Sequence, residues 1–167
     1  MKTFTCKLDK VSILITINVL LFGLFLLIGP NLAFMENREG SFILQSAGAV
    51  LLLLMIVFYL LSPRAYGFDK EYLFIGRMVA PLRIPLSEIA NVRMPDTKEL
   101  NWAIRTFGNG GLFGYTGRYY TKHIGKMNWQ CTRRSNFVVV ERTNNIPLVI
   151  SPDEPAKFVF EFNQGAK

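Results

Sequence analysis

Hydrophobic positions are concentrated near the start of the chain, in two runs that carry no charge. Residues 11–35 and 41–63 contain no Asp, Glu, Lys or Arg and are rich in Leu, Ile, Val and Phe. Neither run has an amphipathic stripe, as expected of helices whose whole circumference faces lipid. About 20 apolar residues suffice to cross a bilayer core of roughly 30 Å. The pattern predicts a membrane segment at residues 11–63, with helices at about 11–30 and 42–61.

Apolar and polar positions alternate in much of the remainder, residues 64–167, which is typical of half-buried strands. We expect hairpins that turn at residues 69–71 and 144–145, where short polar side chains tolerate turn conformations. Expected strands lie at residues 65–68, 72–79, 100–107, 112–121, 136–142 and 146–150. Residues 82–86 also alternate and lead into 87–94, but Pro81 and Pro85 favour an edge or a bend there over a central strand.

At the end of the chain, the spacing of hydrophobic residues changes from every second residue, as in a strand, to about every 3.6 residues, as in a helix. Ser151 and Pro152, with a glutamate three positions after the serine, match the N-cap and first residue of a helix. Phe158 and Phe162 then share one helical face. Pro155 fits only the first turn of such a helix, and the alternation of its phenylalanines also permits a strand. The expected architecture is membrane-anchored α+β: a two-helix transmembrane hairpin, then a small antiparallel barrel or sandwich closed by a C-terminal helix.

Cations flank the two hydrophobic runs asymmetrically. Three lysines lie in residues 1–10, and Arg64, Lys70 and Arg77 follow the second run, whereas the connector at 36–40 has one arginine against two glutamates. The positive-inside rule places a basic N-terminus and the C-terminal domain in the cytoplasm, so we expect a multi-pass protein of the cytoplasmic membrane with both termini inside. A cleaved signal peptide is the alternative for the first run, but that run is longer than a usual apolar signal region and no A-x-A site follows it.

Charge is distributed unevenly within the C-terminal domain. From Arg64 onward there are 15 Lys and Arg against 9 Asp and Glu, and residues 100–140 contain no carboxylate. Near an anionic leaflet each cation contributes about 1 kcal/mol, and Tyr or Trp favours the interface. Strand alternation would place about half of the aromatic residues of this segment in the core. The residues predicted to contact a membrane surface or a partner are Arg105, Arg118, Tyr119, Lys122, Lys126, Arg133 and Arg134.

Catalytic and metal-binding motifs are not recognisable in the sequence. His123 is the sole histidine, and Cys6 and Cys131 are far apart without metal-ligand spacing, so we expect no metal, no cofactor, no catalytic residues and free thiols. The glycine-rich segment at 108–114 favours a turn or bulge over a phosphate loop, because strand-like residues follow it. Nucleic-acid binding is not expected, since no DNA- or RNA-binding motif accompanies the cations.

Two glycine- and proline-containing segments carry a family resemblance. One lies in the centre of the domain and the other precedes the predicted C-terminal helix; their residues are Gly108, Gly110, Gly114, Tyr115 and Gly117, then Ser151, Pro152, Asp153 and Phe158. With the strand-rich pattern, they make residues 64–164 similar to the bacterial pleckstrin-homology-like domains, in particular to a membrane-anchored subgroup. The resemblance implies a seven-stranded, partly open barrel with a capping helix. The resemblance implies no ligand. Some eukaryotic relatives bind phosphoinositides, but a shared fold alone does not imply a shared ligand.

Two functional hypotheses remain. In the first, the chain is a non-catalytic interaction module that binds anionic headgroups or an acidic protein partner through its basic and aromatic segment. In the second, it is a scaffold or assembly subunit of a membrane complex without headgroup recognition, and it offers a strand edge or groove to a protein. Asn18 and the small residues at 46–49 favour helix association in that second case, and a homo-oligomer is compatible with it.

Overall fold

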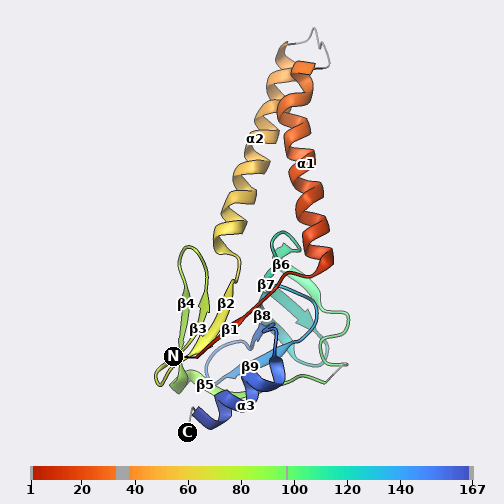
Figure 1. The fold of residues 1–167 in the computed structure, drawn as a ribbon. Coiled ribbons are helices and arrows are strands. Elements are labelled where there is room, and N and C mark those ends of the chain that lie inside the picture. The colour runs from red at the N-terminus through yellow and green to blue at the C-terminus, as the bar shows by residue number, and fades with distance from the viewer. Residues whose placement is uncertain (1, 33–37, 97, 166–167) are drawn as a thin grey trace.

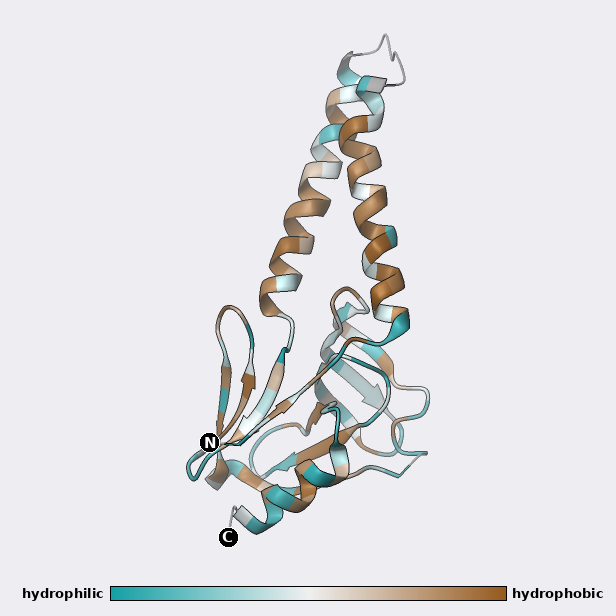
Figure 2. Ribbon diagram, viewed as in Figure 1, coloured by the Kyte–Doolittle hydropathy of each residue, from teal (hydrophilic) through white to brown (hydrophobic). Residues whose placement is uncertain are grey.

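The computed structural model describes residues 2–32, 38–96 and 98–165, and consists of two long helices that stand on a β-rich domain (Figure 1). The helices are α1 (Lys10–Leu32) and α2 (Arg38–Leu61). Both are long and apolar enough to cross a membrane, and most of their side chains are exposed. Figure 2 shows that hydrophobic residues cover most of both helices. The connector at 33–37 lies outside the described residues.

Two glycines determine where the helices touch. A Cβ atom on Gly48 would stand 2.8 Å from the backbone nitrogen of Leu27, and one on Gly23 would stand 2.9 Å from the Leu52 side chain. The helices therefore pack backbone to backbone at this level. From there they diverge toward the domain (Figure 1). The small residue at position 48 is thus already used for contact within the hairpin.

The domain contains two sheets. The smaller sheet has the order β1–β2–β3–β4, with strands β1 (Lys2–Thr5), β2 (Ala65–Phe68), β3 (Tyr72–Gly76) and β4 (Leu82–Pro85). The larger sheet has the order β5–β9–β10–β8–β7–β6, with strands β5 (Ile89–Arg93), β6 (Ile104–Gly110), β7 (Tyr115–Thr121), β8 (Gly125–Cys131), β9 (Val138–Arg142) and β10 (Leu148–Ile150). A short 3₁₀ turn, η1 (Leu86–Glu88), joins the two sheets.

The first strand was not foreseen. Residues 1–10 were expected to form only a basic N-terminus, but β1 pairs antiparallel with β2, from Lys2 opposite Phe68 to Thr5 opposite Ala65. Phe4 is buried and its ring packs against those of Phe68 and Phe158. The helical hairpin therefore leaves the domain at the end of one strand and returns at the start of the neighbouring strand.

Several boundaries differ from the sequence-based expectations. The strand expected at 72–79 ends at Gly76, and the one expected at 100–107 begins only at Ile104, because Trp102 has a φ of 57° and is exposed. One strand pairing within the expected antiparallel arrangement is parallel. The predicted hairpin at 144–145 brings β10 back between β9 and β8, so that β10 is antiparallel to β9 but parallel to β8.

The C-terminal helix starts three residues later than the capping pattern suggested. Helix α3 (Pro155–Gly165) has Pro155 in its first position, and the Phe158 N–H donates to the Glu154 carbonyl at 3.0 Å. Ser151 is not its cap: it is fully buried, and its Oγ accepts a hydrogen bond of 2.9 Å from the backbone N–H of Thr132. Phe158 and Phe162 are buried together against the sheets, as the spacing predicted.

The larger sheet has a hydrophobic cluster on each face. Val138 and Val140 of β9 face the smaller sheet and α3, whereas Val139 between them faces the opposite cluster, with Trp129 and Tyr119. This alternation follows from the period-2 geometry of strands. The loop before β6, through Leu100 and Ala103, covers part of the second cluster.

We expect Gly108→Ala and Gly117→Ala to lower the free energy of unfolding by about 2 kcal/mol or more, through left-handed strain and overpacking. These glycines face each other across β6 and β7 with φ of 110° and 124°, and a Cβ on either would stand 2.8 Å from the Cα of the other. Gly76→Ala is the matched control, since its Cβ would make only an ordinary 3.5 Å contact. Thermal unfolding of the full chain in detergent measures the difference. Equal effects at positions 76 and 108 would contradict the packing described.

Candidate interaction surface

The tip of the β6–β7 hairpin lies between the bases of the two helices. Ser12 Oγ of α1 donates to the Gly111 carbonyl at 2.7 Å, and the Phe113 N–H donates to Thr16 Oγ1 at 3.1 Å. On the other side, the Phe113 ring meets the Tyr59 ring of α2 edge to face, with centroids 5.1 Å apart. The glycine-rich segment is therefore a structural wedge between α1 and α2.

The Asn109 side chain stabilises this tip by hydrogen bonds to its backbone. Its Oδ1 accepts from the Leu112 N–H at 3.0 Å, and its Nδ2 donates to the carbonyls of Leu112 and Gly114. The Gly111 N–H also donates to the Gly114 carbonyl, at 2.9 Å. The backbone N–H groups of Leu112 and Gly111 are thus occupied by internal bonds, which is the opposite of a loop that presents its N–H groups to a phosphate.

Asp9 connects α1 to the larger sheet. As the N-cap of α1 it accepts from the Ser12 N–H at 2.7 Å. The same carboxylate accepts from the Tyr115 hydroxyl, at 3.2 and 3.3 Å, and from the Arg134 N–H at 3.1 Å. Burial and the nearby Asp9 carboxylate raise the pKa of Tyr115 to about 12, so this hydroxyl remains a donor at neutral pH. Sequence reasoning missed Asp9, although an Asp with Ser three positions later, before an apolar run, is an N-cap signal.

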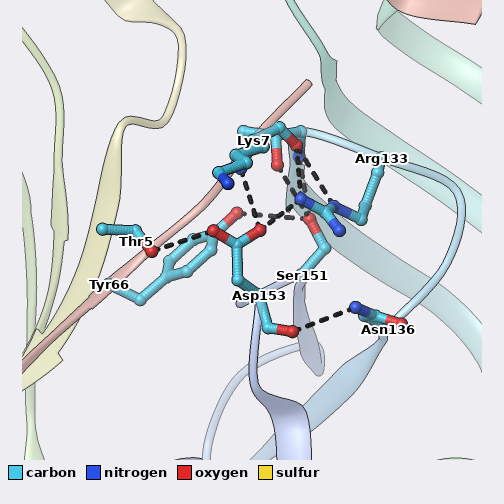
Figure 3. A network of polar contacts seen from close by, with 8 residues as sticks. Thr5, Lys7, Tyr66, Arg133, Asn136, Ser151 and Asp153 are labelled. Atoms are coloured by element: carbon cyan, nitrogen blue, oxygen red, sulfur yellow. Dashed lines mark hydrogen bonds and ion pairs between the residues drawn. The ribbon is translucent and has the colours of Figure 1, made fainter. Parts of the chain in front are cut away.

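Arg133 and Asp153 form a second connection (Figure 3). The guanidinium of Arg133 pairs with the Asp153 carboxylate and donates to the Lys7 carbonyl at 3.0 and 3.1 Å. Asp153 also accepts from Thr5 Oγ1 at 2.8 Å and from the Lys7 N–H at 3.1 Å. The segment between β1 and α1 is therefore bound to the loops after β8 and β10, and the partly buried Arg133 guanidinium makes these contacts within the protein.

The seven predicted contact residues do not form one surface. Tyr119 is only 3% exposed; its ring stacks on Trp129 with centroids 4.2 Å apart, and its hydroxyl donates to the Asn109 carbonyl. The backbone N–H of Arg134 donates to the Asp9 carboxylate, and the Arg134 guanidinium lies 5.8 Å from the centre of the Tyr115 ring. Arg105 lies on the same face as Tyr119 and packs over Gly110. The side chains of Arg118, Lys122 and Lys126 are the cations left exposed away from these contacts.

One face of β6, β7 and β8 combines these cations with exposed apolar side chains. In the register, Ile104 lies opposite Tyr120 and Phe107 opposite Arg118, while Tyr120 also faces Lys126 on β8. Phe107 is 76% exposed, and Ile104 and Tyr120 are exposed as well. The smaller sheet covers the β9 and β10 part of this face, whereas the β6 and β7 part has no cover among the described residues. We use the name β6 face for the exposed surface made by Ile104, Phe107, Arg118, Tyr120, Lys122 and Lys126.

A cleft of about 510 Å³ lies at the end of the β6 face farthest from the wedge. Trp102, Ile104 and Tyr120 supply apolar walls, and Lys98, Lys122 and His123 supply charged or polar groups around them. Such a cleft suits an apolar side chain whose neighbours carry negative charge.

Strand β6 is also an edge of the larger sheet. Its one partner in the sheet is β7, so the outer backbone groups of β6 lack a ladder neighbour among the described residues. A register shift between Arg105 and Phe107 marks a bulge, where Thr106 Oγ1 donates to the Arg118 carbonyl at 3.1 Å. Bulges protect edges from indiscriminate pairing, so an incoming strand would have space only on part of β6.

The cleft end of the β6 face lies far from the helices. The β6–β7 tip touches α1 and α2, and β7 has 7 residues, so its far end is up to about 20 Å from that tip. Lys122 and His123 lie at this far end, in the turn between β7 and β8. The cleft is therefore separated from the hairpin tip that touches the helices by about the length of β7.

The titratable groups indicate no activated nucleophile in the described part of the chain. Burial raises the pKa of Cys6 to about 11 and raises the pKa of the fully buried Cys131 still more strongly. Thiols in that state are poor nucleophiles. Among the described residues, no three His, Cys, Asp or Glu side chains gather in a group that could hold a metal ion.

Comparison with known families agrees with this architecture. The Bacterial PH domain family matches residues 64–166. The chain belongs to the bacterial PH domain family. Members of this family are typically non-catalytic. No curated protein and no solved structure matches the chain. The matched range begins after α2, so β1, Asp9 and both helices lie outside it, although β1 is a strand of the domain's smaller sheet.

We expect Asp9→Ala to loosen α1 from the larger sheet and to lower the free energy of unfolding by about 2 kcal/mol, because a helix cap and two further hydrogen bonds are lost. Hydrogen exchange of the full chain in detergent should accelerate at the β6–β7 tip and at residues 6–9. The control is Asp69→Ala, which also removes two backbone hydrogen bonds, of 2.8 and 2.9 Å, but in an exposed turn of the smaller sheet. If Asp69→Ala accelerates exchange at the tip as much, Asp9 has no special role.

Proposed function

We propose that this bacterial PH domain protein is a membrane-anchored, non-catalytic module that faces the cytoplasm and binds an acidic, partly apolar segment of a protein partner on its β6 face. The observation that carries the proposal is the combination of an edge strand, exposed apolar side chains and cations without an ion pair among the described residues, on a surface whose cleft end is far from the helices. Each element of the proposal rests on a separate feature.

Membrane anchoring rests on α1 and α2. Their lengths, their apolar sequences and their exposed side chains fit a hairpin that crosses the bilayer twice. Since β1 and β2 pair with each other, a crossing hairpin leaves both termini on the same side (Figure 1). The flanking cations favour the cytoplasm for that side, as a protein of the cytoplasmic membrane. Cleavage of the first helix as a signal would also remove β1 from its sheet.

Protein rather than lipid is the better occupant of the β6 face. Electrostatic attraction to a membrane surface decays over about 8 Å at physiological ionic strength. Lys122 lies in the turn at the far end of β7, up to about 20 Å from the tip that touches the helices. Cations near the helix bases, such as Arg64, which lies 4.5 Å from the centre of the Tyr59 ring, are better placed for headgroups.

The chemistry of the β6 face defines the partner. Residues 100–140 carry no carboxylate, and none of the ion pairs among the described residues involves Arg118, Lys122 or Lys126. A bound segment with Asp or Glu would neutralise these cations, and an apolar side chain would fill the cleft beside Trp102. Addition of a short strand to the free edge of β6 would supply backbone hydrogen bonds.

Assembly through the helices has less support. Gly48 is used in the contact with α1, and the Asn18 amide donates to the Leu14 carbonyl of its own helix at 2.8 Å. Asn18 and Gly48, two residues that favoured helix association, therefore have contacts within the hairpin. A scaffold role of the protein remains compatible with the β6 face, since a partner bound there would be held at the membrane.

We expect a photoreactive phenylalanine analogue at Phe107 to form an adduct with a protein in native membranes, whereas the same analogue at Tyr72, an exposed aromatic position on β3, forms none. Arg118→Glu with Lys122→Glu should abolish the adduct, because the variant repels an acidic segment, and raised salt should weaken it. The matched control is Lys70→Glu with Arg83→Glu, which reverses two exposed cations of the smaller sheet and its turn.

Three results would overturn the proposed partner. They are a phospholipid adduct at position 107, a protein adduct that survives charge reversal on the β6 face, and equal adducts at positions 72 and 107. The first result would instead assign the β6 face to the bilayer.

A further inference from the structure

The loop between β3 and β4, residues 77–81, has a tip made only of apolar residues. Met78 and Val79 are 55% and 50% exposed, and Ala80 and Pro81 are exposed beside them. Isolated exposed apolar residues are normal on a protein surface. Four in succession at the tip of a hairpin are different, because together they form one continuous exposed apolar segment.

The one charged residue of the loop is turned inward. Arg77 Nη2 donates to Gln130 Oε1 of β8 at 2.6 Å, and its guanidinium is partly buried. Burial lowers the pKa of Arg77 from its ordinary value, although the group stays charged at neutral pH. The loop is therefore anchored to the larger sheet by its cation, while its apolar tip extends away from that anchor.

The last turn of α2 sets the position of the tip. The Val79 N–H donates to the Leu60 carbonyl at 3.2 Å, one of the carbonyls that α2 itself leaves unsatisfied at its C-terminus. Figure 1 shows the β3–β4 loop rising beside α2 to the level of its lower end. Tyr59 and Arg64 lie at the same end of α2, with the guanidinium 4.5 Å from the ring centre. A tyrosine and an arginine at a helix end are typical of the membrane interface.

We infer that the tip of the β3–β4 loop inserts into the interfacial layer of the leaflet that α2 enters, as a third membrane contact. The inference rests on the membrane insertion of α1 and α2 that we propose above, and is independent of the partner at the β6 face. With the two helices, the loop would define three points of a plane and so fix the tilt of the domain. A second copy of the chain or another protein over Met78 would be a different occupant, and the test separates these cases.

Depth measurements on spin-labelled full-length protein test this inference. Single cysteines at Met78, at Lys122 in the β7–β8 turn and at Leu20 in α1 are introduced into a Cys6→Ala chain. The fully buried Cys131 stays in place, and a chain without an added cysteine gives the background. The proteins are reconstituted in phosphatidylcholine–phosphatidylglycerol vesicles. The measured quantity is the ratio of label accessibility to oxygen, which partitions into lipid, over accessibility to a water-soluble nickel chelate.

We expect the ratio to be highest at position 20, intermediate at 78 and lowest at 122. A Val79→Asp substitution should shift the ratio at 78 toward the value at 122, since a carboxylate resists insertion. A ratio at 78 equal to that at 122, or a label at 78 that is immobile and shielded from both reagents by protein, overturns the inference while leaving the helices in the bilayer. A low ratio at position 20 would overturn the membrane proposal itself.

Discussion

The pairing of β1 with β2 governs how the whole molecule is arranged. These strands continue directly into α1 and out of α2, so their antiparallel ladder holds the two helix bases at a fixed separation. The wedge at Phe113 then has a defined space to fill, and Asp9 can reach both its own helix and β7. Without β1, the wedge and the Asp9 contacts would remain, but the sheet ladder that joins the segment before α1 to the segment after α2 would be lost. With β1, the helices and the domain share several independent connections.

Because the domain is attached to the helix bases at one end, its two ends differ in chemistry. The end near the helices uses its polar groups internally, as with Asp9 and the Arg133–Asp153 pair, and presents the apolar β3–β4 tip to the outside. The far end leaves Lys122 and its neighbours unpaired beside an apolar cleft. An anchored domain that could rotate would expose both ends to the membrane in turn. A fixed one keeps the cleft end of the β6 face away from the helix bases, as the function that we propose requires.

Local patterns allowed part of this to be predicted from sequence. The two uncharged runs predicted α1 and α2. Strand alternation and turn residues predicted the hairpin of β9 and β10, and the family resemblance predicted the bacterial PH domain. The missed features depend on long-range partners. Four residues with no turn signal become β1 only because β2 lies beside them. Tyr119 is buried and Tyr120 is exposed because successive residues of a strand point to opposite faces of the sheet. Arg133 is paired within the protein because Asp153 lies opposite it.

Hydrogen exchange at β1, in the full chain reconstituted in lipid vesicles, tests the central claim most directly. Amides held in a sheet ladder exchange only when that part of the structure opens. The account predicts that the ladder-bonded amides of residues 2–5 exchange as slowly as those of β2 and β3, their neighbours in the smaller sheet. Exchange at residues 2–5 as fast as in an unstructured peptide, with β2 and β3 still protected, would contradict it, because residues 2–5 would then not be a strand of the smaller sheet.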